Sequence, residues 1–280
     1  MPEGLKGGFP TYWTDFGNGP REALLIHCTL GHTGAWKGMA AGLSDLLHMT
    51  AFDLPGHGRS GDWDDRGPLQ RITTDMAAEF LKWPMDVIGH SFGATVALRL
   101  ATEHPDLVRS LVLIEPVFFA VAYADDPAAR DRHDAELAGY AEALEAGDLM
   151  TAARVFSDVW GDGRDWDSLP ENLRKKMAQT IGMIDAAAPE IIEDAPGLLH
   201  SGALEDLAMP VLVIEGEKTP EVARLVAAGL NRRIGNCRVE TVAGAGHMAP
   251  ITHPDVVAAM IRDFLENEAV GDQPFAAERN

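Results

Sequence analysis

The sequence Gly89-His90-Ser91-Phe92-Gly93 places a serine between two glycines, directly after the mainly apolar run Met85–Ile88 and directly before a run with helical periodicity. A serine at the junction of a strand and a helix lies on a sharp, strained turn, which exposes its hydroxyl oxygen and requires small neighbours. Such a hydroxyl can attack a carbonyl carbon. The alternative is that Ser91 only caps the helix that follows it. The strand, turn and helix context favours a nucleophile.

A serine hydroxyl is a weak nucleophile at neutral pH, so a base must lie within hydrogen-bonding distance of it. Histidine is the side chain whose charge changes near that pH, and the chain has 10 histidines. His247 lies in the glycine-bearing loop 244–251, between the last predicted strand and the last predicted helix. That position puts His247 at the sheet edge where Ser91 also lies. We therefore predict that His247 is the base, the alternative being a loop histidine exposed to water.

Short apolar runs bounded by turn residues recur along the chain, with helical patterns between them. This alternation is typical of parallel strands buried on both faces. It predicts an α/β fold with a mostly parallel central sheet, helices on both faces and a ligand site beyond the carboxyl ends of the strands. The predicted strands are residues 23–27, 49–53, 85–89, 110–115, 211–215 and 238–242, and the clearest predicted helices are Phe92–Glu103 and Pro254–Asn267.

The alternation is interrupted once, between residues 116 and 209. Helical patterns at 129–146, 149–160 and 172–187 follow one another there without a strand between them. We interpret residues 116–209 as a helical lid inserted between two strands of a core domain formed by residues 1–115 and 210–269. Residues 270–280 carry little helical pattern and are predicted to be a loose tail.

Composition and charge narrow the classes of function. The chain has 280 residues, of which 46% are hydrophobic, so it has enough apolar material for a buried core. Its net charge of −20 argues against binding to nucleic acid or to a membrane surface, because both are anionic. No cluster of lysine or arginine is visible in the sequence, so a neutral substrate is expected.

Cysteine usage and the N-terminal residues bear on metal sites and location. Two cysteines, Cys28 and Cys237, are too few for a disulfide-rich scaffold or a multi-cysteine metal site. The sequence shows neither a signal peptide nor an apolar run of about 18 residues, so a cytoplasmic protein is the default expectation.

Four motifs together resemble the α/β-hydrolase family of the lid-bearing type. They are the predicted strand Leu24-Leu-Ile-His27, which leads to the oxyanion loop; Asp53-Leu-Pro-Gly-His-Gly-Arg-Ser60, which matches the family's D-x-P-G-x-G-x-S loop; the nucleophile elbow 89–93; and Gly246-His247. They occur in the family's order, and their framework covers nearly all of the chain outside the predicted lid. The resemblance implies an α/β-hydrolase fold and a serine hydrolase that cleaves carboxylic esters or related acyl compounds through an acyl-enzyme.

The resemblance also implies the other parts of the site. The backbone N–H groups of Thr29 and Phe92 would form the oxyanion hole. Cys28 stands where the family usually has glycine, and we interpret it as a small, buried residue beside the substrate. Phe118 and Phe119 are the first candidates for the wall of a substrate pocket. The implied substrate is a small neutral or apolar acyl compound, with no metal and no organic cofactor; the oligomeric state is unknown from the sequence.

The third member of the catalytic triad departs from the family's usual pattern. The family's acid commonly lies in a Gly-Glu-x-Asp-Pro context, but here the matching stretch has Thr219 at the aspartate position. A hydroxyl cannot supply the negative charge that orients the histidine. Glu115, at the end of the preceding strand, is the first candidate for a relocated acid, because certain haloalkane dehalogenases carry their acid there and adjacent strand ends lie about 5 Å apart. Glu217 is the second candidate.

Other functions remain open on the sequence alone. The same fold hosts C–C bond hydrolases, lyases and acyltransferases, and a chain without its usual acid could be a non-catalytic protein that binds a small molecule. Asp53 is interpreted as a residue that fixes its loop. His32, His57 and His90 lie near the predicted site, but their spacing does not suggest a metal centre.

Overall fold

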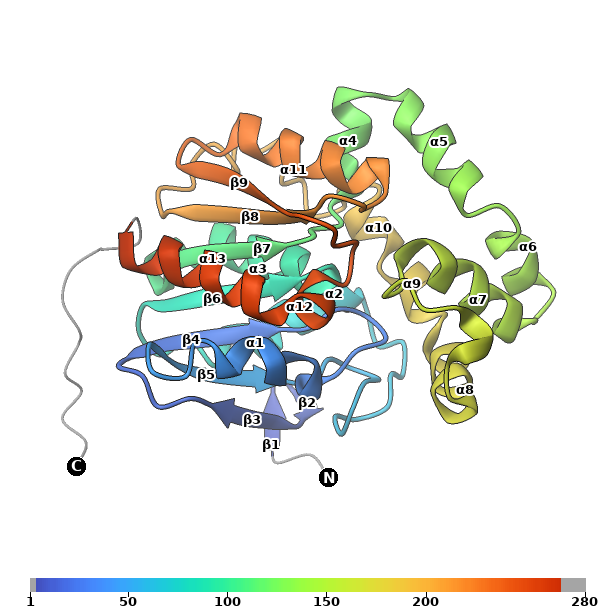
Figure 1. Ribbon diagram of the computed structural model, residues 1–280. Coiled ribbons are helices and arrows are strands. Elements are labelled where there is room, and N and C mark those ends of the chain that lie inside the picture. The colour runs from blue at the N-terminus through green and yellow to red at the C-terminus, as the bar shows by residue number, and fades with distance from the viewer. Residues whose placement is uncertain (1–3, 268–280) are drawn as a thin grey trace.

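The computed structural model describes residues 4–267, and within them the central feature is a seven-stranded sheet in the order β3-β5-β4-β6-β7-β8-β9 (Figure 1). Strands β4 to β9 are parallel to their neighbours, and β3 is antiparallel at one edge. The strands are β3 (Trp13–Phe16), β4 (Arg21–Ile26), β5 (Leu47–Phe52), β6 (Met85–His90), β7 (Val108–Ile114), β8 (Val211–Gly216) and β9 (Cys237–Val242). The predicted mostly parallel α/β sheet is confirmed.

Alternate residues of the central strands point to opposite faces of the sheet, and both faces are buried. Leu24 and Ile26 of β4 pack in one hydrophobic cluster, with α2 (Leu69–Ala78), α3 (Phe92–Glu103) and α11 (Glu221–Arg233). Ala23 and Leu25 of the same strand pack in the other cluster, with α1 (Lys37–Ala41) and α13 (Pro254–Asn267). Burial on both faces explains why the strands are continuous apolar runs.

The sequence analysis did not predict the N-terminal strands. A two-stranded ribbon, β1 (Gly4–Lys6) and β2 (Phe9–Thr11), precedes the edge strand β3. Each of the three elements has only three or four residues, and β3 is only partly buried. Strands this short carry neither an apolar run nor a clear alternation, so the sequence gives little signal for them.

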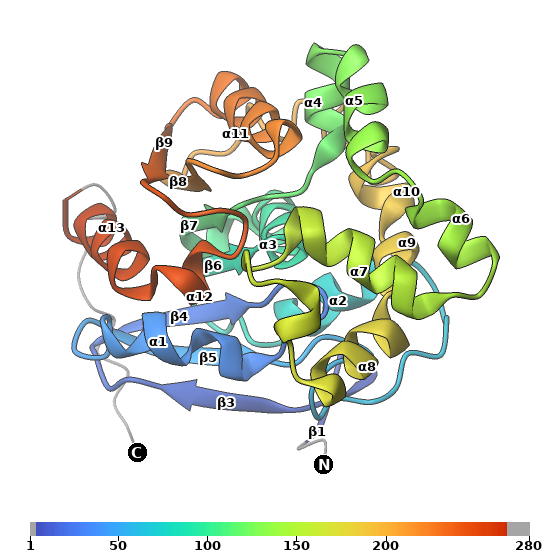
Figure 2. The same cartoon turned by 45° about the vertical axis from the view of Figure 1, so that its right-hand side comes forward.

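The segment between β7 and β8 is helical, and it lies beyond the ends of the parallel strands (Figures 1 and 2). They are α4 (Phe119–Asp125), α5 (Ala128–Glu136), α6 (Tyr140–Glu145), α7 (Leu149–Trp160), α8 (Glu171–Thr180), α9 (Met183–Ala186) and α10 (Ala188–Ile191). The predicted helix 129–146 is divided into α5 and α6 at Gly139, whose φ of 87° does not fit a helix. Helices α6, α7 and α8 share a small hydrophobic cluster of their own.

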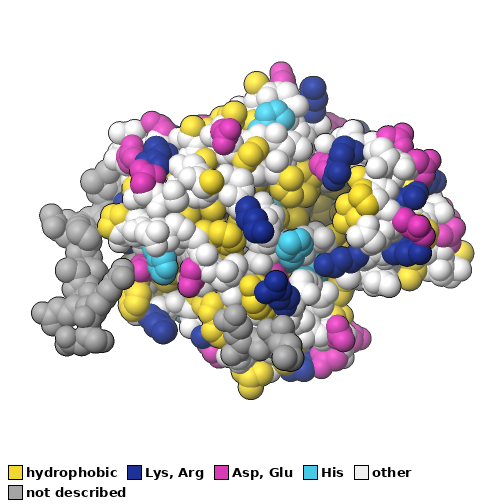
Figure 3. Space-filling view, turned by 60° about the horizontal axis from the view of Figure 1, so that its bottom comes forward, with side chains coloured by type: hydrophobic (Ala, Val, Ile, Leu, Met, Phe, Trp, Pro, Cys, Tyr) yellow, Lys and Arg dark blue, Asp and Glu magenta, His cyan; other side chains and the backbone are white. Residues whose placement is uncertain are grey.

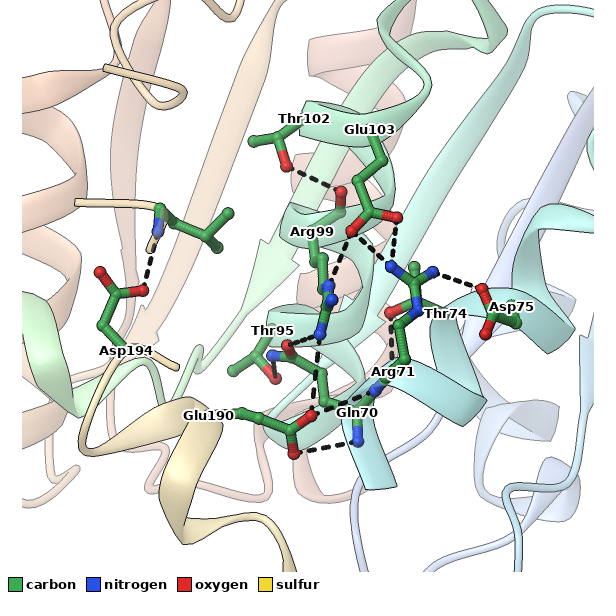
Figure 4. Close-up of polar contacts among 11 residues, drawn as sticks. Gln70, Arg71, Thr74, Asp75, Thr95, Arg99, Thr102, Glu103, Glu190 and Asp194 are labelled. Carbon is green, nitrogen blue, oxygen red and sulfur yellow. Dashed lines mark hydrogen bonds and ion pairs between the residues drawn. The ribbon is translucent and has the colours of Figure 1, made fainter. Parts of the chain in front are cut away.

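A buried carboxylate connects these helices to the core. Glu190 of α10 accepts hydrogen bonds from the backbone N–H groups of Gln70 (3.1 Å) and Arg71 (3.2 Å) at the start of α2 (Figure 4). The Gln70 side chain in turn donates to Thr95 (3.0 Å) in α3, the helix that follows Ser91. The N-terminus of α2 is thereby capped by a residue of the inserted segment.

Two further observations concern the predicted tail and the predicted absence of a membrane span. The predicted loose tail, residues 270–280, lies outside the described residues. Among residues 4–267, no helix combines the length and the apolar character that crossing a membrane requires.

Asp86 anchors the strand that carries the nucleophile elbow. Its buried carboxylate, at the start of β6, accepts hydrogen bonds from Arg21 (3.0 and 2.9 Å), Arg109 (2.9 and 2.6 Å) and Ser110 (2.8 Å). Burial alone would raise the pKa of Asp86, but the hydrogen bonds from Arg109 and Arg21 outweigh it and lower that pKa. The stabilisation is therefore present at neutral pH and is lost as the pH falls through the lowered pKa.

We expect Asp86→Asn to lower the free energy of unfolding by about 3 kcal/mol, because it removes the charge that two guanidinium groups share in a buried place. Urea unfolding measures this change. Asp64→Asn is the matched control, since Asp64 and Arg66 form an exposed pair (2.6 Å) and its loss should cost less than about 1 kcal/mol. Equal, small effects of the two variants would contradict the prediction.

Candidate active site

Ser91 lies on a tight turn between β6 and α3. Its φ of 57° is in the left-handed region, where a residue with a side chain is strained. A Cβ atom on Gly89 would meet the carbonyl oxygen of Gly93 at 2.4 Å, and one on Gly93 would meet that of Ile26 at 2.1 Å. Both glycines are therefore required by close backbone contacts. The turn that the sequence pattern predicts is present, and it presents the Ser91 hydroxyl at the end of the sheet.

His247 lies beside this hydroxyl. The loop between β9 and α12 (Ala249–Thr252) carries the imidazole, whose Nε2 is 2.9 Å from Ser91 Oγ and whose Nδ1 is 3.0 Å from Glu115 Oε2. All three residues are buried. Because a carboxylate only accepts hydrogen bonds, Nδ1 carries the proton, and Nε2 is left to accept the proton of the serine hydroxyl. The structure thus brings together the three residues that the sequence analysis selected.

Glu115 is held in place by three donors. It follows β7 with a φ of 51°, and its carboxylate accepts hydrogen bonds from the backbone N–H of Gly216 and the hydroxyl of Thr219 as well as from His247. Burial favours the neutral acid, but the hydrogen bonds from His247, Thr219 and Gly216 outweigh it and lower the pKa of Glu115. The side chain is therefore an anion at neutral pH. Thr219, at the position of the family's usual acid, donates to the carboxylate that faces His247.

The second candidate for the acid lies elsewhere. Glu217 is exposed, and its carboxylate accepts a hydrogen bond from the backbone N–H of Gly244 (2.7 Å). This geometry favours Glu115 over Glu217 as the partner of His247.

Two buried histidines shape the loop that contains Thr29. His27 donates through Nδ1 to the carbonyl of Cys28 (2.7 Å), and its Nε2 accepts from the N–H of Leu54 (3.1 Å). His57 accepts through Nε2 from the N–H of Leu30 (2.9 Å), a residue with a φ of 62°. Burial is the main cause that lowers the pKa of both rings, that of His57 to about 4, so both are neutral at pH 7. They position backbone groups.

His90 connects the nucleophile turn to the histidine loop. Its Nε2 donates a hydrogen bond to the carbonyl oxygen of His247 (3.0 Å). Burial, and then the neighbouring His247, lower the pKa of His90 to about 3, so that this ring stays neutral. The residue directly before Ser91 therefore helps to hold the loop that carries His247.

Asp53 also has a structural place, as the sequence analysis expected. Its buried carboxylate accepts hydrogen bonds from the backbone N–H groups of Thr33 (2.6 Å) and Arg59 (2.8 Å). It joins the loop after β4 to the loop after β5.

Two cavities meet beside these residues. One, of about 210 Å³, is lined by Ser91, Thr29, Phe92 and mostly apolar side chains of the inserted helices; we call it the Ser91 cavity. The other, of about 290 Å³, is lined by residues that include Thr29, Cys28 and Met248; we call it the Met248 cavity. Thr29 lines both cavities, so the proposed oxyanion loop lies where they meet.

Trp160 lines both cavities, as do Thr29 and Phe156. It is buried at the end of α7, and its ring centroid is 4.7 Å from that of His247, with the two planes nearly perpendicular. Trp160 ends the helical pattern 149–160 of the sequence, and nothing in the neighbouring residues marks a contact with His247.

The predicted substrate-pocket residues have different positions. Phe119 lines the Ser91 cavity, and Cys28 lines the Met248 cavity; contact of either residue with a substrate stays a prediction. The expectation for Phe118 is wrong: its ring is fully buried in the main hydrophobic cluster and lines neither cavity. Phe118 directly precedes α4 and packs in the core, whereas Phe119, the first residue of the helix, lines the cavity.

Comparison with known proteins agrees with this geometry. The sequence profile of the Alpha/beta hydrolase family matches residues 23–260. The chain is 29% identical over 263 residues to a pimeloyl-[acyl-carrier protein] methyl ester esterase of Methylococcus capsulatus, covering 89% of this chain and 96% of that one. It is 30% identical over 262 residues to lipase LipV of Mycobacterium tuberculosis, covering 89% and 94% of the two chains.

Similar folds are found among solved structures. Cfl2 from Burkholderia cenocepacia has a TM-score of 0.70 at 22% identity, with 92% of each chain covered. DBJA has a TM-score of 0.70 at 20% identity, with 96% of this chain and 99% of that one covered. At this level of identity the likeness concerns the fold.

Proposed function

Because this chain belongs to the alpha/beta hydrolase family, we propose that it is a serine hydrolase that cleaves a carboxylic ester or a related acyl compound through an acyl-enzyme. The observation that carries the proposal is the hydrogen-bonded series Ser91, His247 and Glu115 at the edge of a cavity. The relatives named above are an esterase and a lipase, which supports hydrolysis of an ester.

In the proposed reaction, Ser91 Oγ attacks the carbonyl carbon while His247 Nε2 takes the hydroxyl proton. The negative charge then develops on the carbonyl oxygen, where the backbone N–H groups of Thr29 and Phe92 would stabilise it. His247 next gives its proton to the oxygen of the leaving alcohol, and the acyl group stays on Ser91. A water molecule, activated by the same imidazole, releases the acid. Glu115 keeps the imidazole oriented and stabilises its charged form.

The helical segment 116–209 would serve as the lid of this site. Phe119, Phe156 and Trp160 line the Ser91 cavity from that segment, so a closed lid would keep bulk water from the acyl-enzyme. The apolar lining also supports a neutral, apolar acyl group as the part of the substrate that binds there.

The proposal is tested with p-nitrophenyl esters of two to eight carbons and with a fluorophosphonate probe. We expect turnover of the short esters and one probe molecule bound per chain, attached to Ser91. The probe should not label Ser91→Ala. The proposal would be refuted if the folded protein turned over no ester and no thioester and did not react with the probe.

A further inference from the structure

The substrate of the proposed reaction has two parts, and the two cavities separate them. This step rests on the proposed function. The acyl group stays bonded to Ser91, and Ser91 lines the Ser91 cavity but not the Met248 cavity. The leaving group takes its proton from His247, and the Met248 cavity is lined by Met248, which directly follows His247 in the chain, and by Ile251 of α12. The leaving group therefore belongs in the Met248 cavity.

The Met248 cavity adjoins a charged groove. The groove, of about 450 Å³, shares His32 and Gly34 with that cavity. Three cations line it, and they come from separate parts of the chain: Lys37 starts α1, Arg59 lies in the loop after β5, and Lys176 lies in α8. The groove thus begins where the leaving group would point away from Ser91.

The positive charge of the groove is not neutralised by ion pairs within residues 4–267. All three cations are exposed, and none of them has a carboxylate within the ion-pair distance of 4.0 Å there; Arg59 lies over the ring of Tyr12 at 4.6 Å. The one acidic residue of the groove, Asp53, has its side chain only 2% exposed and already accepts two backbone hydrogen bonds. The groove therefore presents positive charge to the solvent.

This concentration of charge is unexpected in a chain with a net charge of −20. Figure 3 shows several lysine and arginine side chains near the middle of one face, and others beside acidic side chains toward its edges. The sequence analysis expected a neutral substrate because no basic cluster is visible in the sequence. Folding assembles one, and a local positive potential next to an active site attracts and orients anions.

We propose that this groove binds an anionic group at the far end of the leaving group. The preferred substrates would then be acyl compounds whose alcohol or thiol carries a carboxylate or a phosphate. The acyl group itself stays apolar, in agreement with the lining of the Ser91 cavity.

Paired substrates test the proposal. The first substrate of each pair is a 4-hydroxyphenylalkanoic acid, with an acid chain of two to six carbons, whose phenol oxygen carries a butyryl group. The second is the same butyrate ester with the free carboxylate replaced by a primary amide. Each pair has the same acyl group and nearly the same leaving phenol, and differs in one negative charge. At the chain length that reaches the groove, we expect the carboxylate to have a KM about tenfold lower than the amide at low ionic strength. This advantage should shrink in 0.5 M salt, because salt screens exposed charges. A phosphate in place of the carboxylate then shows which anion is preferred.

A charge-matched pair of variants places the effect in the groove. Lys37→Gln/Lys176→Gln should remove the preference for the carboxylate and leave the kcat and KM for neutral p-nitrophenyl butyrate unchanged. Lys82→Gln/Lys175→Gln removes the same charge from exposed positions outside the groove and should keep the preference. Equal KM values for acid and amide along the whole series, or equal losses in both double variants, would overturn the proposal. Failure of the proposed function would be seen separately, as absence of turnover of p-nitrophenyl butyrate.

Discussion

Replacing Ser91 by alanine is expected to lower kcat for p-nitrophenyl butyrate by about 10⁵- to 10⁶-fold, the effect of removing a nucleophile from a serine hydrolase triad. The reason is that, among residues 4–267, the hydroxyl of Ser91 is the one bonded to the Nε2 of His247 (2.9 Å), so without it an acyl-enzyme cannot form. The residual rate would reflect binding and the oxyanion hole alone. Steady-state kinetics with highly purified variant, together with a circular dichroism spectrum, measure the change.

The matched control for this experiment is Ser44→Ala. The Ser44 hydroxyl is exposed and donates to the carbonyl of Ala41 (3.1 Å), so its loss should leave kcat within twofold of the parent protein. If folded Ser91→Ala kept more than a tenth of the activity, Ser91 could not be the nucleophile.

The second large effect is expected for Glu115→Gln, which should lower kcat by about 10³- to 10⁴-fold. A neutral amide cannot stabilise the imidazolium, and its NH₂ group can face Nδ1 and so favour the unproductive tautomer of His247. The change in volume is small, so the packing around the buried side chain is largely kept. Kinetics with p-nitrophenyl butyrate and thermal unfolding of each variant separate a catalytic effect from a loss of folded protein.

Glu217→Gln is the matched control, because it makes the same chemical change directly after β8, which ends at Gly216. Since Glu217 is exposed and bonds to Gly244, we expect its kcat to stay within about threefold of the parent protein. A large loss in Glu217→Gln with full activity in Glu115→Gln would assign the acid to the other carboxylate.

Much of the fold was predictable because its signals are local. Strands buried on both faces are mostly apolar, so the interior strands appear in the sequence as short apolar runs, and the six strands predicted in this way lie side by side in the structure. The same logic fails for β1, β2 and β3, since strands of three or four residues are too short to show a pattern. It also fails for the division between α5 and α6, which depends on the left-handed conformation of Gly139.

The candidate site was predictable to different degrees. Ser91 and His247 each lie in a stretch whose neighbouring residues reveal its place at the end of a strand, so both could be selected from the sequence; their catalytic roles stay predictions. Glu115 and Glu217 could only be ranked, because either carboxylate follows a neighbouring strand. What separates them in space is that Glu115 is buried against His247 and accepts a hydrogen bond from Thr219, whereas Glu217 is exposed.

The sequence by itself determined the parallel sheet, the strained serine turn and the loop of the histidine, because each depends on the backbone requirements of a few consecutive residues. Only the tertiary structure decided that Phe118 belongs to the core, that Trp160 touches His247 and that Lys37 and Lys176 border one groove. These contacts join segments that are distant in the chain. They depend on how the inserted helices pack against the sheet, and no single stretch of sequence records that packing.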